Sequence, residues 1–203
     1  MNSAYNLFEK ILNDNRNAMV TYDFLANNVQ PPYEYTDLLR WQWAQAVSAL
    51  DKLVHDLVKI GISQEFTNTR QKTDKYLSLV IPIRIHTNLN LETDENRKLH
   101  IFQQYMVEKL STESYQVPEK IADALAYIWS EQHKWQLIAA QMRLTEVDVK
   151  TKLKSIVLRR NQIVHAGDYI DISQPKQIIQ KNDVMDVCDF IHKVGQAIFN
   201  LVK

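Results

Sequence analysis

The chain has 203 residues, of which 45% are hydrophobic and 24% charged, with only 3 Gly and 5 Pro. This length and composition are typical of one ordered, helix-rich domain and exclude disordered and collagen-like chains. The 24 Lys and Arg residues balance the 24 Asp and Glu residues, so no overall charge marks the protein for nucleic acid, membranes or acidic ligands. Gly61, Gly167 and Gly195 lie too far apart to form dinucleotide, Walker-type or nucleophile-elbow motifs.

Cysteine and histidine usage restricts the chemistry further. Cys188 is the only cysteine, which excludes an internal disulfide and any zinc site with two or more cysteines. The six histidines form no H-E-x-x-H motif and no metal-spaced pair, so we expect neither metal nor cofactor. No apolar run has the length of a membrane span, and the N-terminus does not resemble a signal peptide. We therefore expect a soluble, cytoplasmic protein that does not contact membranes.

Two helical segments open the chain. The first is predicted from Ala4 to about Val20, followed by a connection that contains Asn27, Asn28, Pro31 and Pro32. The second is predicted over residues 37–60, where apolar residues recur with the helical period. Its stripe, which we expect to face the core, consists of Leu39, Trp43, Ala46, Val47, Leu50, Val54 and Leu57.

The middle of the chain carries weaker signals. Residues 62–90 include an apolar, β-branched stretch interrupted by Pro82, and we predict helix followed by irregular chain. A polar helix is predicted from about Glu92 to Leu110. The next helix begins at Pro118, where the missing N–H of proline costs nothing, and includes Trp129.

Two further helices have clear boundaries. The stretch Thr145–Asp148 resembles a capping box that opens a helix, and Gly167 is suited to end it in a left-handed conformation. A last helix is predicted over residues 182–202, with an apolar stripe that includes Cys188. The sequence thus predicts an all-α, single helical bundle of about six or seven helices. It would form one domain over residues 1–203, in which 1–34 provide an N-terminal helix and connection and 35–203 the core.

Residues 143–165 contain a concentration of basic side chains, which is either a solvated face or a surface that attracts phosphate. On the helical wheel, Arg160 falls among the apolar residues Leu153, Ile156 and Val157. A guanidinium keeps its charge on burial. Arg160 must therefore pair with a carboxylate, extend to solvent along its stem, or face a groove that receives an anion.

Asn161 and His165 lie one helical turn apart beside Arg160. An imidazole can take and return a proton near neutral pH, and a guanidinium can neutralise the charge that builds on a phosphate during transfer. These groups suffice for RNA cleavage, in which the ribose 2′-OH attacks the adjacent phosphodiester without a metal ion, and DNA would be spared. The structural alternative is a histidine that caps the C-terminus of its helix.

The string RRNQIVHAGD at 159–168 resembles the Arg-polar-x-x-x-His signature of the HEPN superfamily, and most of all its RiboL-PSP-HEPN branch. Supporting segments are LLRWQWAQAVSALDKLVHDLV at 38–58, PEKIADALAYI at 118–128 and KWQLIAAQM at 134–142. They occur in the order that the branch shows, and the resemblance covers about residues 35–200.

The resemblance implies an all-α bundle that forms a homodimer, with two signature helices facing one composite active site. It implies that Arg160 contacts the scissile phosphate, Asn161 orients the substrate and His165 is the general acid and base. Many relatives are metal-independent endoribonucleases in toxin–antitoxin or anti-phage defence systems. The partners would then be RNA and an antitoxin or defence protein. The alternative is a non-catalytic HEPN module that binds RNA, a nucleotide or a protein.

Four further residues are candidates for supporting roles: Arg159, Asp51, His55 and Asp168. Asp51 and His55 lie one turn apart at the edge of a buried helix face. They either bond to each other, or Asp51 supplies the carboxylate that positions Arg160, or they form an ordinary surface pair. Asp168 follows the signature helix, where it either approaches the groove or accepts hydrogen bonds from local backbone N–H groups.

Overall fold

The computed structural model describes residues 1–29 and 35–203, and within them the chain forms nine α-helices and no β-strand. The predicted all-α fold is confirmed, with more helices than the six or seven expected because several short ones lie between the long ones. In chain order they are α1 (Asn2–Asn28), α2 (Thr36–Phe66), α3 (Asp74–Leu77), α4 (Ile83–Leu91), α5 (Glu95–Leu110), α6 (Pro118–Leu125), α7 (Lys134–Gln141), α8 (Glu146–Ala166) and α9 (Lys181–Val202).

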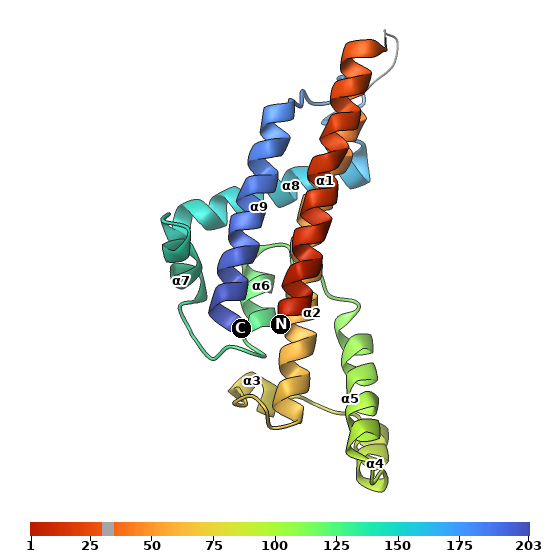
Figure 1. Cartoon of the computed structure of the whole chain (residues 1–203), viewed down its shortest axis with the longest axis vertical. Helices are drawn as coiled ribbons and strands as arrows, with labels where there is room; N and C mark the ends of the chain where they lie inside the picture. Colours follow the sequence, from red (N-terminus) through yellow and green to blue (C-terminus); the bar gives the residue numbers. More distant parts are fainter. Residues whose placement is uncertain (30–34) are drawn as a thin grey trace.

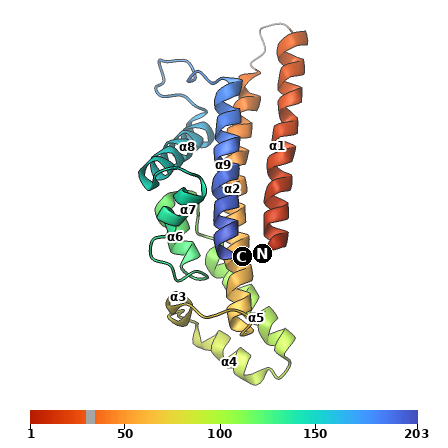
Figure 2. The ribbon, with the colours of Figure 1, turned by 60° about the vertical axis from the view of Figure 1, so that its left-hand side comes forward.

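Helix α2 is the central element, and it packs against α1, α5, α6, α8 and α9. Figures 1 and 2 show α1, α2 and α9 running side by side along the long axis of the molecule. Every residue of the stripe predicted for α2 is buried, from Leu39 to Leu57. The helix continues past the predicted end at Ile60 to Phe66, and this last part also packs inward through the buried Ile62.

Helices α1 and α9 pack against α2 and against each other. Ala4, Phe8 and Leu12 of α1 are buried in the same hydrophobic core as α2 and α9. Helix α1 continues beyond the predicted end at Val20 as far as Asn28, and Val20 and Phe24 on this extension are exposed. The connection predicted at Asn27 and Asn28 therefore starts later, while Pro31 and Pro32 lie outside the described residues.

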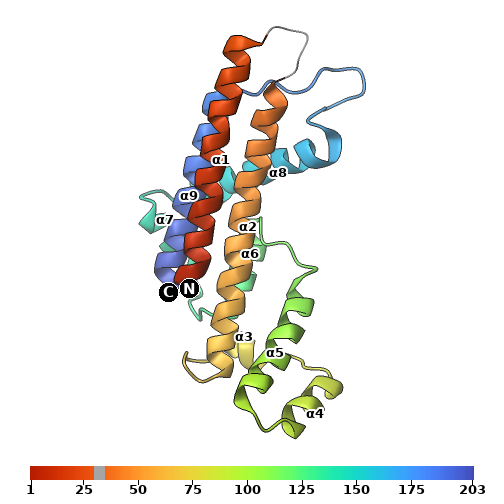
Figure 3. The same ribbon diagram turned by 45° about the vertical axis from the view of Figure 1, so that its right-hand side comes forward.

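The segment 62–90 differs from the prediction of helix followed by irregular chain. After α2 it contains two short helices, α3 and α4, separated by residues 78–82. No residue of α4 is fully buried, and α4 packs mainly against α5, with which it forms one end of the molecule (Figure 3). Pro82 precedes the first residue of α4, which explains why the apolar stretch around it forms no strand.

The remaining helix boundaries follow local chemistry. Helix α5 begins at Glu95 and not at Glu92, because the Asp94 carboxylate accepts hydrogen bonds from the N–H groups of Asn96 and Arg97. Pro118 begins α6 as predicted, but this helix ends at Leu125, before Trp129. Helix α9 begins at Lys181, and its predicted apolar stripe is buried from Val184 to Val202. No helix in the described part of the chain combines the length and the hydropathy needed to cross a bilayer.

Close approach of α1 and α9 depends on Gly195, so we expect Gly195→Ala to lower the free energy of unfolding by about 1–3 kcal/mol. A Cβ atom at this position would overlap the ring of Phe8 and lie 3.0 Å from Cδ2 of Leu53. Thermal and urea denaturation of the full chain would measure the loss.

The double variant Phe8→Leu with Gly195→Ala provides the control, since a smaller side chain makes room for the new methyl group. The cost of Gly195→Ala should be smaller in that background. An equal cost in both backgrounds would show that the contact with Phe8 is not the cause.

Candidate functional site

The candidate site lies on the last turns of α8, the helix that carries the signature. The Thr145 hydroxyl accepts a hydrogen bond from the N–H of Asp148 at the start of this helix. Gly167 ends it with φ of +59°, as predicted. Helix α8 crosses the long helices, and its C-terminal turns extend past α2 (Figure 3). The apolar residues Leu153, Ile156 and Val157 are therefore buried, whereas Val164, in the C-terminal turns, is 49% exposed.

The carboxylate of Asp168 is the centre of a buried ionic network just after the helix. Asp168 has no exposed surface, and its Oδ2 accepts hydrogen bonds from Nε of Arg40 at 2.9 Å and from a terminal nitrogen of Arg159 at 3.2 Å. Its Oδ1 accepts a hydrogen bond from Nε2 of Gln177 at 3.3 Å. The prediction that Asp168 serves local backbone N–H groups is therefore wrong, because its side chain binds residues from α2, α8 and the segment before α9.

The same network fixes the chain between α8 and α9. Arg40 also donates to the carbonyl of Gln177 at 2.7 Å, and Arg159 donates to the carbonyl of Ile178 at 2.8 Å. The N–H of Gln177 donates to the carbonyl of Asp168 at 3.0 Å. Asp168 itself has φ of +67°, an uncommon backbone conformation for an aspartate. Buried ionic contacts thus hold the end of the signature helix in one conformation.

Arg159 faces the protein interior. Besides its bonds to Asp168 and Ile178, its guanidinium lies 5.1 Å from the ring centroid of Trp43, within the range of a cation–π contact. Trp43 in turn donates from its indole nitrogen to the carbonyl of Ile156 at 3.0 Å. Arg159 therefore joins α8 to α2, which identifies it as a structural arginine.

Arg160, the next residue, has a different environment. In the described part of the chain it forms no ion pair, unlike Arg159, whereas the Nε atoms of both arginines are buried without a hydrogen-bond partner. One terminal nitrogen donates to Oδ1 of Asn161 at 3.1 Å. Of the three possibilities for Arg160, pairing with a carboxylate is therefore not observed among residues 1–29 and 35–203. Its half-buried guanidinium retains an unneutralised charge with free N–H donors, which suits it to an anionic ligand.

His165 lies in the last turn of α8, one turn beyond Asn161, and it is exposed. Its ring forms no hydrogen bond or ion pair with other described residues. The structure thus places Arg160, Asn161 and His165 along one helix, with a direct bond only between the first two. The imidazole is therefore accessible to a molecule that binds at this surface.

Asp51 and His55 do not join this group. The Asp51 carboxylate accepts hydrogen bonds from the N–H of Tyr115 at 2.7 Å and from Nε2 of Gln116 at 3.0 Å. Nε2 of His55 lies 3.6 Å from Oδ1 of Asp51, and its ring lies against Tyr115. Asp51 on α2 therefore binds the segment that precedes α6, and it does not position Arg160.

The basic character of α8 is largely neutralised within the protein. Lys150 pairs with Glu146 at 3.2 Å, Lys154 pairs with Glu119 at 2.5 Å, and Arg159 pairs with Asp168. Among the lysines and arginines of this helix, Lys152 and Arg160 form no ion pair with the described residues. The phosphate attraction expected of the whole segment is thus confined to fewer positions, of which Arg160 is the one beside the other signature residues.

Sequence reasoning missed two residues of the network, Arg40 and Gln177. Arg40 lies at the edge of a buried helix face, which indicates that its charge needs a carboxylate partner. That partner, Asp168, is 128 residues away in the sequence. No pattern in the sequence marks Gln177. Among residues 1–29 and 35–203, no group of three or more His, Cys, Asp or Glu side chains is arranged to hold a metal ion.

Comparison with known proteins gives one match. The sequence profile of the family described as RiboL-PSP-HEPN matches residues 6–203, which include every helix from α2 to α9. Neither the curated proteins nor the solved structures contain a match to this chain.

The different environments of Arg159 and Arg160 can be tested by comparing the stability of two alanine variants. Arg159→Ala leaves part of the buried Asp168 carboxylate unpaired, and we expect it to lower the free energy of unfolding by about 1–3 kcal/mol. Arg160→Ala removes no ion pair, and its cost should stay below about 1 kcal/mol. Urea denaturation of both variants and the wild type would measure the difference, and a larger cost for Arg160→Ala would show that Arg160 is the structural residue.

Proposed function

Because the chain belongs to the RiboL-PSP-HEPN family, we propose that it is a metal-independent endoribonuclease whose acting residues are Arg160, Asn161 and His165. The substrate is RNA, and the products carry 2′,3′-cyclic phosphate and 5′-hydroxyl ends. The observation that carries this proposal is the contrast between two neighbouring arginines. Arg159 is neutralised by Asp168, whereas Arg160 pairs with no carboxylate of the described residues and donates to Asn161 of the signature.

In the proposed reaction, the 2′-oxygen of the ribose attacks the adjacent phosphorus. The bond from phosphorus to the 5′-oxygen breaks, so one proton leaves the 2′-hydroxyl and one proton is delivered to the 5′-oxygen. Arg160 neutralises the negative charge on the non-bridging oxygens as the phosphorus becomes five-coordinate. The bond from Arg160 to Asn161 limits the orientations of the guanidinium, and Asn161 retains its amide N–H groups to donate to the RNA.

The reaction needs one group that accepts a proton and another that donates one, and His165 supplies a single imidazole per chain. A homodimer with two signature helices facing each other provides both groups in one composite site. Apolar side chains on the signature helix and in the chain that follows it are exposed, which suits them to contact a second copy. They are Leu158 at 62%, Val164 at 49%, Ile170 at 65%, Ile172 at 105% and Ile178 at 83%.

We further propose that this activity serves a cytoplasmic toxin or anti-phage effector, controlled by an antitoxin or another defence protein. Cleavage of cellular RNA stops growth, so an active enzyme of this kind needs a partner that restrains it. Expression of the wild-type chain without a partner should arrest bacterial growth, and His165→Ala should not.

The decisive experiment uses purified wild-type protein and the His165→Ala variant with end-labelled mixed RNA in excess EDTA. The wild type should cleave, and the variant should cleave about 10²–10⁴ times more slowly, because it lacks the proton-transfer group. Arg160→Ala should lose activity with little change in melting temperature. The 5′-hydroxyl ends are identified by direct phosphorylation with a polynucleotide kinase, without prior phosphatase treatment, and the cyclic phosphate ends by mass.

Two controls separate catalysis from other effects. The variant His55→Ala removes a histidine that lies outside the signature and should retain activity, and a DNA of the same sequence should remain intact because it lacks the 2′-hydroxyl. If RNA binds but neither wild type nor variant cleaves it, the non-catalytic binding module replaces the proposed enzyme. If His165→Ala cleaves as fast as the wild type, the assignment of His165 is wrong.

A further inference from the structure

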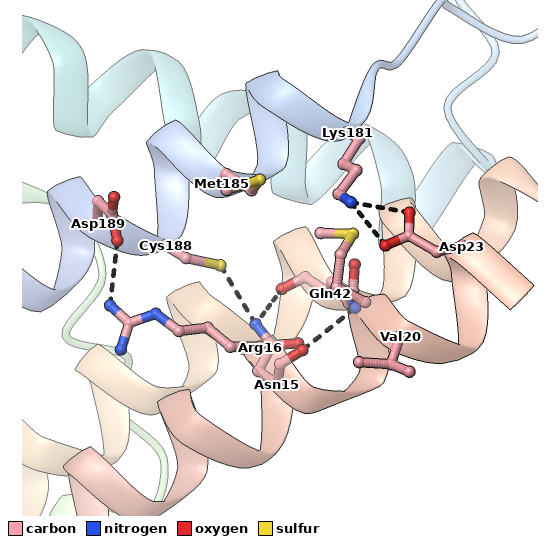
Figure 4. A pocket seen from close by; sticks show the side chains of 10 residues that line it. Asn15, Arg16, Val20, Asp23, Gln42, Lys181, Met185, Cys188 and Asp189 are labelled. Atoms are coloured by element: carbon pink, nitrogen blue, oxygen red, sulfur yellow. Dashed lines mark hydrogen bonds and ion pairs between the residues drawn. The ribbon is translucent and has the colours of Figure 1, made fainter.

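A pocket between α1, α2 and α9 contains none of the signature residues. Its volume is about 280 Å³, at the small end of the range for ligand pockets. Met19 and Val20 come from α1, Gln42 from α2, and Met185 and Cys188 from α9. Figure 4 shows the side chains of Val20, Gln42, Met185 and Cys188 around the space between the helices. The lining is mainly apolar, apart from a few polar groups on its inner side.

Two buried amides on that inner side have one unused oxygen each. Asn15 and Gln42 are 2% and 1% exposed. Nδ2 of Asn15 donates to the carbonyl of Gln42 at 2.9 Å, and Nε2 of Gln42 donates to the carbonyl of Asn15 at 3.1 Å. Because both partners are carbonyl oxygens, the amide nitrogens must face them. Oδ1 of Asn15 and Oε1 of Gln42 are thereby turned away, and neither has a hydrogen-bond partner among the described residues.

Unpaired buried acceptors are costly to a fold, since each has lost its water without gaining a donor. Here two of them belong to residues that line the same pocket. A ligand that brings N–H donors recovers this cost, which gives the pocket a preference for donors over acceptors.

The charges around the pocket are already balanced. Arg16 pairs with Asp189 at 3.1 Å, and Lys181 pairs with Asp23 at 2.7 Å. Figure 4 shows these ion pairs at opposite ends of the pocket, with the two amides and Cys188 between them. Each pair joins α1 to α9, so both ends of the opening are bridged. A charged ligand would have to break one of these pairs, whereas an uncharged ligand leaves both intact.

The sulfur atoms favour a polarizable, unsaturated ligand. Met19 and Met185 flank the pocket, and methionine sulfur makes favourable contacts with aromatic rings while its flexible chain adapts to the ligand's shape. Burial raises the pKa of the Cys188 thiol to about 11, so this group stays neutral and adds no charge to the site. Nδ2 of Asn15 also lies 3.4 Å from the sulfur of Cys188.

We propose that this pocket binds an uncharged heteroaromatic molecule, about the size of a bicyclic ring, whose N–H groups donate to Oδ1 of Asn15 and Oε1 of Gln42. Both oxygens are shielded by neighbouring side chains, so binding includes a rotation of the flexible Met19 or Met185 side chain. Indoles and nucleobases share this chemistry. The site contains none of the residues proposed for RNA cleavage, and it stands whether or not the chain is a ribonuclease.

The test follows the full-length protein labelled with ¹³C at its methionine methyl groups. The signals of Met19 and Met185 are assigned with Met19→Leu and Met185→Leu. Indole, benzimidazole and adenine serve as N–H probes, and benzofuran, which replaces the N–H of indole by oxygen, serves as the matched control. We expect at least one N–H probe to shift both methyl signals saturably, while the signal of Met106, which lies on α5, stays in place.

Loss of the donor should weaken binding about tenfold, so benzofuran should bind about ten times more weakly than indole where indole is the ligand. Gln42→Met removes one acceptor while the length of the side chain stays nearly constant. The difference in affinity between indole and benzofuran should therefore be smaller in this variant. Val20→Trp places a bulky side chain on the exposed rim and should abolish binding without disturbing the core. Circular dichroism and melting temperature confirm that each variant is folded.

A second measurement locates the ligand. Cys188 is the only cysteine, so the rate of its reaction with methyl methanethiosulfonate reports on the pocket alone. A bound probe should slow this reaction, whereas benzofuran at the same concentration should slow it less. The His165→Ala variant should bind the probe as the wild type does, which keeps this result separate from the test of RNA cleavage.

Three results would overturn the proposal. One is that none of the three N–H probes shifts the Met19 and Met185 signals saturably up to its solubility limit. Another is that benzofuran binds as tightly as indole, which would show that the amide oxygens take no part. The third is that Val20→Trp leaves binding unchanged, which would place the ligand elsewhere.

Discussion

One buried carboxylate determines the orientation of the candidate site. Asp168 binds Arg40 of α2 and Arg159 of α8, and both arginines also hold the chain that leads to α9. Successive residues on a helix point about 100° apart. With Arg159 fixed toward Asp168 and Trp43, the rotation of the last turns of α8 is fixed as well. Arg160, Asn161 and His165 then have defined directions away from that network. The signature residues owe their placement to a neighbour that has no part in the proposed chemistry.

The periodic parts of the fold were predictable from the sequence. The stripes of α2 and α9 are buried as expected, and Pro118 and Gly167 mark real helix ends, because each of these signals acts within one or two helical turns. Arg160, Asn161 and His165 were identified by a local spacing and a family resemblance. Their position on one helix follows from the same spacing.

The long-range parts were not predictable. The partners of Arg40 and Asp51 lie 128 and 64 residues away, and no sequence pattern connects them. Asp51 was a candidate partner of Arg160 because both have suitable charges, but charge alone does not specify which chain segments meet. Similarly, α3 and α4 are short helices in a region where apolar residues, Pro82 and turn residues give conflicting local preferences.

The pocket and the signature helix are organised by one short stretch of α2. Gln42 lines the pocket, and the next residue, Trp43, donates to the backbone of α8 and faces Arg159. Adjacent positions on α2 thus serve two separate surfaces, since neighbouring helical residues point in different directions. A substitution at Gln42 or Trp43 that shifts this part of α2 would affect both the pocket and the contact with α8. Substitutions at Val20 and Met185 would affect the pocket alone.

The absence of fully buried residues from α4 has a consequence for its tolerance to change. Because α4 packs mainly against α5 and reaches the core through the half-buried Leu89, most of its sequence is under little constraint from folding. Exchanges at its exposed positions should leave the long helices and the Asp168 network unchanged.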